Sequence, residues 1–385
     1  MKVGTCPQTD ILQISGFKHG SLPFKYLGIP ISSKNLTKNE GRKLIDKITA
    51  RIRAWVAKHL SYAGMLTLVT SVLHTLHSYW ASIFLIPNCI MNRIYSICRN
   101  YLWGGGTDSY MHAPAINWEK YCSPKEEGGL GLKNAKTWNT AMLGKYVWWV
   151  ASKKDHLWVR WINHVYLKGS YWTHYTPPND CSWSWKKIAH IMAKFRNAYN
   201  SDLWLGTPAD YSIKAWYKWM RQRLPRIPWW RICWNSMNVT RTSFIFWVVM
   251  LGRLLTRDRL VRMGGGPDMN CYLCQSADEN HDHLFFECTF SKRCVTLMQL
   301  KLQVDFSPND IIKWNSRGRR DNILIRKIVC ACHVHLAYLI WQARNKARVM
   351  NKVIHPRVIV HQAIQGVLTR VWARNTSAIP TTDET

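Results

Sequence analysis

The sequence predicts a mainly α-helical protein. Apolar residues recur at helical spacing in two long segments, residues 37–103 and 321–350, as expected for helices that each pack one face on a core. Gly104-Gly-Gly106 marks the end of the first segment, because consecutive glycines are costly inside a helix. With 47% hydrophobic residues in 385, the chain is long and apolar enough to bury real cores, which excludes a disordered basic tail.

The first long helix is predicted to begin at residue 37. Thr37 and Glu40 have the spacing of a capping box, in which each side chain accepts a hydrogen bond from the other residue's amide. Behind this start, one face of the helix is apolar, comprising Leu44, Ile45, Ile48, Ile52, Trp55 and Val56. The rest of the helix surface is basic. Such a surface is equally consistent with exposure to solvent and with contacts to phosphate groups.

Residues 59–92 contain no Lys, Arg, Asp or Glu, and such a stretch is long enough to cross a bilayer. At helical spacing, however, most of its Ser, Thr and His residues lie on a different face from its apolar residues. The apolar residues form a row made of Leu66, Val69, Leu73, Leu76, Trp80 and Ile83. This pattern predicts an amphipathic helix on a core and no membrane span. If that row were exposed, the helix would have lost a domain on which it normally packs.

The rest of the chain is predicted to be helical with irregular connections. A third helix covers roughly residues 91–102, and another covers residues 321–350. Residues 104–207 are rich in Trp and read as short helices joined by loops, with Trp mostly filling a core. The last dozen residues, 374–385, are predicted to be a disordered tail.

The charge balance points to a polyanionic partner. The chain has 53 Lys and Arg against 22 Asp and Glu, a net charge of +31, which makes RNA or DNA the expected partner. Residues 211–262 are especially basic and carry a single acid, Asp258. Their cations alternate with flat aromatic rings, which suits phosphates that carry stackable bases. The candidate contacts are Lys214, Lys218, Arg221, Arg223, Arg226, Arg231, Trp216, Trp219, Trp229 and Trp230.

The most specific local pattern is a group of metal-ligand residues. Cys271, Cys274, His283 and Cys288 follow the spacing C-x2-C-x8-H-x4-C, which lets four side chains surround one ion as a tetrahedron. Zinc is the expected ion, and its role is expected to be structural because protein ligands fill all four positions. His281 could replace His283. We favour His283 because Leu284, Phe285 and Phe286 follow it directly and would orient it against a small core.

The other cysteines indicate a reducing environment. Twelve cysteines in 385 residues are too few for a disulfide scaffold, and the first ten residues lack the apolar core of a signal peptide. An intracellular location, nuclear or cytoplasmic, is therefore expected.

Cys294 could replace Cys288 as a ligand only with an unusually long loop.

No pattern indicates catalysis. The sequence has no Asp-Asp dipeptide, phosphate-binding glycine loop, His-Glu-x-x-His or Gly-x-Ser-x-Gly motif. Glu126-Glu127 lies between Ser123-Pro-Lys and Gly-Gly, so we expect an exposed turn there. The chain is predicted not to be an enzyme and to bind no small-molecule substrate.

The order of several segments resembles the C-terminal half of reverse transcriptases from LINE-type (non-LTR) retrotransposons, especially those abundant in plant genomes. The segments are Gly20–Ile31, Lys125-Glu-Glu-Gly-Gly-Leu-Gly-Leu132, Arg253-Leu-Leu-Thr-Arg-Asp-Arg-Leu260, the Cys/His cluster and Ile340-Trp-Gln-Ala-Arg-Asn345. Met65, Thr240-Arg241 and Cys294 depart from residues common in that family.

The resemblance implies a domain plan. It implies a primer-grip end and helical thumb-like region (1–103), a Trp-rich connector (104–207), a reverse-transcriptase zinc-binding domain (208–300) and a C-terminal helical region (301–373). The palm with its catalytic aspartates, the endonuclease and ribonuclease H are missing. The implied product is a truncated, non-catalytic fragment that grips RNA or DNA, with the missing polymerase part as a partner in trans. The alternatives are a zinc-containing protein-interaction module, favoured if basic residues are scattered over every surface, and a non-functional retroelement remnant.

Overall fold

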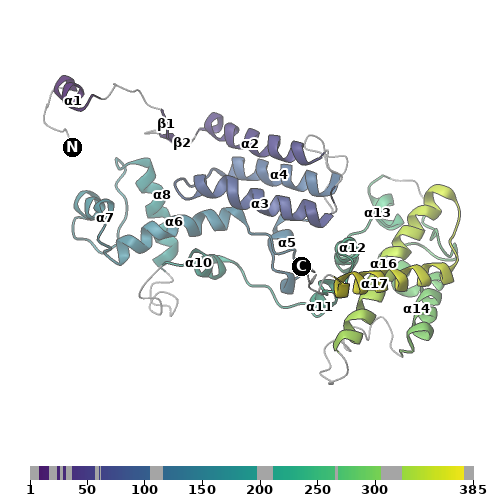
Figure 1. Ribbon diagram of the computed structural model, residues 1–385. Coiled ribbons are helices and arrows are strands. Elements are labelled where there is room, and N and C mark those ends of the chain that lie inside the picture. The colour runs from purple at the N-terminus through teal and green to yellow at the C-terminus, as the bar shows by residue number, and fades with distance from the viewer. Residues whose placement is uncertain are drawn as a thin grey trace, which may run out of the picture.

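The structure is a computed structural model that describes residues 8–16, 24–26, 29–31, 37–56, 60, 62–104, 116–196, 211–264, 268–304 and 323–376. It confirms the mainly α-helical prediction. Within these ranges the strands are β1 (Phe24–Tyr26) and β2 (Ile29–Ile31), which pair antiparallel as a short hairpin. Figure 1 shows the other elements as helices arranged from one end of the molecule to the other. The structure does not test the predicted domain boundaries.

The N-terminal helices are α1 (Gln8–Ser15), α2 (Lys38–Val56), α3 (Tyr62–Ala81) and α4 (Asn88–Gly104), and the last three lie side by side (Figure 1). The predicted capping box is present at the start of α2. The Thr37 amide donates to Glu40 Oε2 at 2.7 Å, and the Glu40 amide donates to Thr37 Oγ1 at 3.2 Å. Leu44, Ile48 and Ile52 are buried, so the predicted apolar face of α2 does pack on the core.

The apolar row of α3 packs largely as predicted. Val69 and Trp80 are buried and Leu66 is half-buried, whereas Ile83, just beyond the helix, is 42% exposed. The side chains of Leu73 and Leu76 lie outside the described residues. The described part of this row therefore does not form the exposed apolar stripe that would mark a lost domain.

The connector consists of short helices around a core rich in Trp. These are α5 (Trp118–Cys122), η1 (Lys125–Glu127), α6 (Ala135–Ala151), α7 (Leu157–Ile162), η2 (Asn163–Leu167) and α8 (Trp183–Arg196), and α10 (Ile213–Met220) packs on α6. Trp148, Trp172 and Trp185 are buried in one core, which confirms their role as filler. Trp161 is 49% exposed and does not fit that role.

The Glu126-Glu127 turn differs from its prediction. It is a turn, as expected, but Glu127 is buried rather than exposed and accepts two hydrogen bonds from the Arg221 guanidinium. This ion pair lowers the pKa of the Glu127 carboxyl. Glu126 pairs with Arg226 at 3.1 Å. The local sequence predicted exposure because the partners lie about 100 residues further along the chain.

The same turn makes Gly129 a sensitive position. A Cβ atom on Gly129 would lie 1.9 Å from the Ser123 carbonyl oxygen and 2.5 Å from that of Lys120. We predict that Gly129→Ala lowers the free energy of unfolding by about 3 kcal/mol, because backbone atoms cannot move aside. The control is Gly131→Ala, where φ is positive but the space is open, and it should cost only about 1 kcal/mol. Equal losses in denaturant unfolding would contradict the clash.

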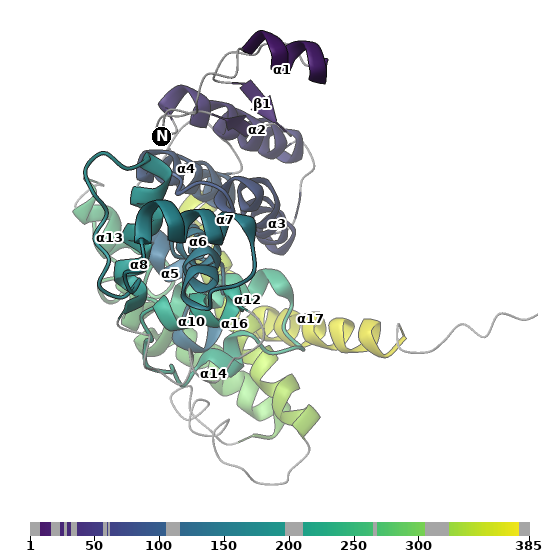
Figure 2. The same cartoon turned by 90° about the vertical axis from the view of Figure 1, so that its left-hand side faces the viewer.

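The C-terminal elements are α11 (Trp230–Cys233), α12 (Thr240–Met250), α13 (Arg257–Arg262), η3 (His283–Glu287), α14 (Thr289–Leu302), α16 (Ile323–Met350) and α17 (Pro356–Thr376). All of them except α13 contribute to one apolar core shared with α2 to α5. The predicted helix at residues 321–350 is confirmed as α16. The predicted disordered tail overlaps the end of α17, and its residues 377–385 lie outside the described part of the chain. Figure 2 shows the C-terminal part of α17 extending beyond the body of the molecule.

Among the described residues, α16 is long and apolar enough to cross a membrane by length and composition, whereas α3 does not meet that test. Half of the apolar window in α16 is buried inside the protein. The helix contacts α11, α12, α14 and α17. These contacts account for its apolar residues as those of a core helix.

Candidate metal centre and basic surface

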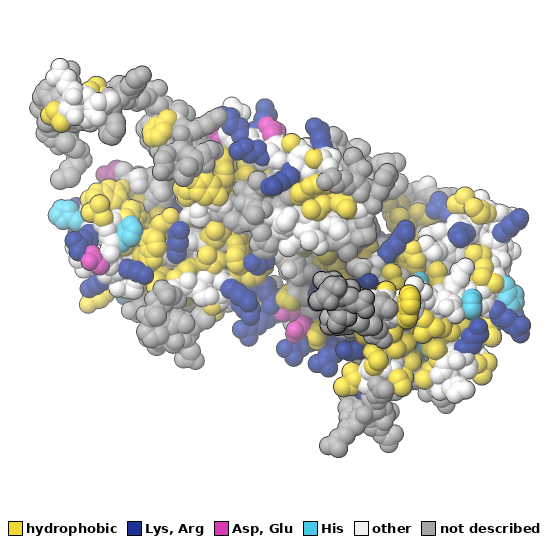
Figure 3. Space-filling model, viewed as in Figure 1, with side chains coloured by type: hydrophobic (Ala, Val, Ile, Leu, Met, Phe, Trp, Pro, Cys, Tyr) yellow, Lys and Arg dark blue, Asp and Glu magenta, His cyan; other side chains and the backbone are white. Residues whose placement is uncertain are grey.

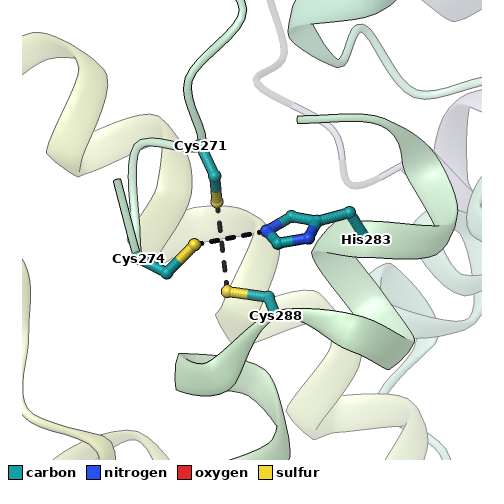
Figure 4. A group of neighbouring side chains, drawn as sticks. All are labelled: Cys271, Cys274, His283 and Cys288. Atoms are coloured by element: carbon teal, nitrogen blue, oxygen red, sulfur yellow. Dashed lines mark hydrogen bonds between the residues drawn. The ribbon is translucent and has the colours of Figure 1, made fainter. Parts of the chain in front are cut away.

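The structure brings the four residues of the predicted metal site together. The ligand atoms of Cys271, Cys274, His283 and Cys288 all lie within 4.8 Å of one another, and the four side chains converge from one loop and one helical turn (Figure 4). Cys271 and Cys288 are fully buried, and His283 is 7% exposed. This cluster could hold a metal ion.

The distances in the cluster fit a tetrahedral ion. A tetrahedron with metal–sulfur bonds of about 2.3 Å and a metal–nitrogen bond of about 2.0 Å separates two sulfurs by about 3.8 Å, and sulfur from nitrogen by about 3.6 Å. The Sγ atoms of Cys271 and Cys288 are 3.9 Å apart, and Cys274 Sγ lies 3.3 Å from His283 Nε2. Three thiols and an imidazole are the donor set of structural zinc sites.

A tight hairpin positions the first ligand pair. Asn270 and Asp278 form an antiparallel bridge, and the Cys271 amide donates to the Ala277 carbonyl at 2.8 Å. Gln275 adopts the left-handed conformation that closes the turn, with φ of 55°. Backbone amides of Leu273 and Cys274 donate to the Cys271 sulfur. The C-x2-C spacing thus produces a loop whose amides are aimed at a thiolate.

The second ligand pair flanks η3. The His283 amide donates to Asn280 Oδ1 at 2.7 Å, and the Cys288 amide donates to the His283 carbonyl. Leu284 and Phe285 are buried behind the imidazole as predicted, whereas Phe286 is 37% exposed. The helical turn therefore fixes both ligands against a small core.

The geometry distinguishes the alternative ligands. His281 points elsewhere: its Nε2 lies 2.6 Å from the Val249 carbonyl and its Nδ1 lies 3.1 Å from Asp282. Cys294 is buried on α14 and does not belong to the cluster. His283 and Cys288 are thus the residues placed for binding, while metal binding itself stays a prediction.

The hydrogen bond between Cys271 and Cys288 shifts the pKa values of these two thiols in opposite directions. The hydrogen bond to Cys288, together with burial, raises the pKa of the Cys271 thiol. The same hydrogen bond lowers the pKa of Cys288, and the amides of Ser291 and Phe290 add to this effect. Of these two hydrogen-bonded thiols, Cys288 is therefore the more readily deprotonated. An incoming cation would displace the remaining protons, which makes binding pH-dependent.

Sequence reasoning missed a buried ion pair beside the cluster. Glu279, in the ligand loop, accepts hydrogen bonds from Arg344 of α16, and the two side chains are 0% and 1% exposed. Glu279 Oε1 also accepts from the Arg257 amide at 3.0 Å, at the start of α13. Tyr272 packs between the guanidinium groups of Arg257 and Arg344, at 3.5 and 5.0 Å. Two features of the sequence could have indicated this pair: the acidic residue Glu279 lies among the Cys and His residues of the cluster, and Arg344 lies within an apolar helical segment.

The structure separates the ten predicted nucleic-acid contacts into four groups. Trp216 and Trp229 are buried, 2% and 9% exposed, so they cannot stack on bases, which corrects their assignment. Arg221 and Arg226 pair with Glu127 and Glu126 within the chain. Trp230 is half-buried beside Arg231. The remaining five are exposed: Lys214, Lys218, Trp219, Arg223 and Arg231.

The exposed cations gather on one edge. Figure 3 shows Lys and Arg side chains along the lower side of the molecule, between α10 and α11. Lys214 also lowers the pKa of Lys133, after burial as the main cause, so the two ammonium groups lie close together. We call the surface formed by Lys133, Lys214, Lys218, Trp219, Arg223 and Arg231 the basic edge.

The Cys/His cluster lies within a segment of the chain that matches a known protein family. Residues 211–294 match the family described as zinc-binding in reverse transcriptase, and this range contains all four ligand residues. The chain is also 33% identical over 165 residues to an Arabidopsis thaliana protein named as a ribonuclease H protein. That match covers 42% of this chain and 26% of the relative, so the chain spans about a quarter of it. Together these matches support a retrotransposon-related protein.

Proposed function

We propose that this chain is the C-terminal part of a LINE-type retrotransposon reverse transcriptase that binds RNA or DNA and has no catalytic activity of its own. The observation that carries this proposal is the Cys/His cluster at tetrahedral spacing inside the region that matches the reverse-transcriptase zinc-binding family. The sequence supports the lack of catalysis, because it contains no Asp-Asp dipeptide of the kind a polymerase palm uses. We further propose an intracellular location and a separate polymerase part as partner.

In this proposal the ion is zinc and its role is structural. Cys271, Cys274, His283 and Cys288 would hold it, and bound zinc would supply folding free energy by joining the hairpin to η3. Because the four side chains complete a tetrahedron, no position is left for a substrate. The chain's own residues then do the binding of nucleic acid, through the basic edge.

Two surfaces support binding to a phosphate backbone. The basic edge combines cations with the exposed ring of Trp219, which suits a single strand. On α2, Lys43, Lys47 and Arg51 are exposed at four-residue spacing, so they form one stripe along the helix (Figure 3). Phosphate contacts carry no sequence information, so binding through these two surfaces should depend little on sequence.

We predict that removing two cations from the basic edge weakens the salt dependence of binding. For single-stranded RNA, the slope of log affinity against log salt should fall by about 1.4 in Lys214→Ala/Lys218→Ala, because each lost phosphate contact contributes about 0.7. The control is Lys153→Ala/Lys154→Ala, which removes the same charge from another exposed site. Fluorescence anisotropy at several salt concentrations measures both.

Two outcomes would count against the proposal. If the wild-type protein shows no salt-dependent binding to RNA or DNA, nucleic acid is not its partner. If both double variants lose the same slope, the charge acts through the net field and the basic edge has no special role.

A further inference from the structure

Specific backbone and side-chain contacts hold the turn between α16 and α17. Asn351 takes the left-handed conformation, with φ of 51°, and its amide donates to the Ala347 carbonyl at 2.9 Å, which closes α16. His355 begins α17, because its Nδ1 accepts from the Arg357 amide at 3.2 Å. Ile354 packs against the core and Pro356 is buried. Both sides of the turn are therefore anchored.

This anchored turn carries exposed apolar side chains. Val349 is 81% exposed, Met350 66%, Val353 46% and Val358 45%. We call these four residues the hairpin tip. The preceding turns of α16 bury their apolar residues, including Leu336, Ile340 and Ala343. The hairpin tip thus exposes several apolar side chains to solvent, on a turn that is anchored on both sides. Packing among the described residues does not explain why these side chains are apolar.

Cations surround the hairpin tip. Lys346, Arg348, Lys352 and Arg357 are exposed on the same few turns of chain. The sequence from residue 322 to residue 382 contains no Asp or Glu. Figure 3 shows Lys, Arg and His together with hydrophobic groups at the right-hand end of the molecule, over the α16–α17 turn, and no Asp or Glu there.

A nucleic-acid duplex satisfies both properties of this surface. Its phosphates pair with the cations, and the apolar faces of its stacked bases accept apolar side chains, as in proteins that insert Met, Leu or Ile between base steps. An acidic protein surface would match the charges but would need its own exposed apolar patch.

We infer that the hairpin tip is a wedge that opens a base step of a bound duplex, with Met350 and Val349 as the intruding side chains. This inference rests on the proposed nucleic-acid function and adds a third contact surface to the basic edge and the stripe on α2. The four cations hold the phosphates on either side of the step. Opening the step kinks the duplex, so that more of its backbone can contact the protein.

The test uses the full chain and a DNA duplex that contains a fluorescent adenine analogue, whose emission rises when it unstacks. Wild-type protein should raise the emission on binding. Val349→Asn/Met350→Asn should bind the duplex about tenfold more weakly, without the rise in emission. Its affinity for single-stranded RNA should be unchanged. The control is Leu300→Asn, which replaces an apolar residue that is 70% exposed on α14 and should behave as wild type.

The outcomes separate the two proposals. If the wild-type protein binds neither strand form, the proposed nucleic-acid function fails. If it binds the duplex without a rise in emission, or if the double variant gives the same rise, the wedge is overturned. It is equally overturned if the double variant keeps duplex binding but loses self-association in light scattering or binding to anionic lipid vesicles.

Discussion

The double variant Cys271→Ser/Cys274→Ser is expected to lose its bound zinc and the ordered structure of the ligand loop. Residues 270–288 contain one isolated bridge and one helical turn, so regular secondary structure does little to join the two ligand pairs to each other. Zinc binding to such sites contributes on the order of 10 kcal/mol of folding free energy. In this variant two hydroxyls, the Cys288 thiol and the His283 imidazole stay enclosed without the ion that would join them, so the loop should open.

Metal analysis of the purified protein measures the first effect, and hydrogen exchange over residues 268–304 measures the second. The wild-type chain should contain about one zinc ion, with slow exchange in this region. Cys89→Ser is the matched control, because Cys89 is an exposed cysteine outside the cluster. Equal zinc content in the double variant and the wild type would contradict the assignment of the site.

The local features of this protein could be predicted from its sequence. Helix positions follow from apolar periodicity, and the start of α2 follows from Thr37 and Glu40, since both signals act over only a few residues. The meeting of Cys271, Cys274, His283 and Cys288 is of the same kind, because C-x2-C spacing determines a tight loop almost independently of the rest of the chain. Even the choice of His283 over His281 was indicated by the apolar run that follows it.

Features that depend on distant partners could not be predicted. Trp216 lies among exposed-looking basic residues, yet α10 turns this ring into the core beside Phe195, at 4.4 Å between ring centroids. Glu127 was expected in solvent because its partner Arg221 is 94 residues away. A local pattern records that a side chain is charged or flat. It does not record which distant element covers that side chain.

Breaking the buried pair between Glu279 and Arg344 is expected to have the second-largest effect on stability. In Arg344→Met the Glu279 carboxylate would stay buried without its counter-charge, which costs about 3–5 kcal/mol. Arg344 donates through Nε and a terminal nitrogen to Glu279 and through another terminal nitrogen to Asn345, so Lys cannot reproduce these contacts. Arg344→Lys should therefore also be destabilised.

The position of Glu279 extends this effect to the metal site. It joins the ligand loop to α13 through the Arg257 amide and to α16 through Arg344. Loss of Arg344 should therefore release zinc at lower denaturant concentration, as well as lower the free energy of unfolding. Arg348→Met, an exposed change on the same helix, should alter neither quantity. A chromogenic chelator follows the release of zinc, and a denaturant unfolding curve gives the free energy of unfolding.

The double variant Glu279→Leu/Arg344→Met distinguishes electrostatics from packing. Removing both charges eliminates the unpaired buried group, so this variant should be more stable than Arg344→Met alone. If it is equally unstable, the Arg344 side chain acts through its packing on Tyr272 and Trp341, which it contacts at 5.0 Å each. If it recovers stability but still releases zinc early, Glu279 holds the ligand loop through the Arg257 amide. Either result would show how a helix outside the metal-binding motif contributes to holding its ion.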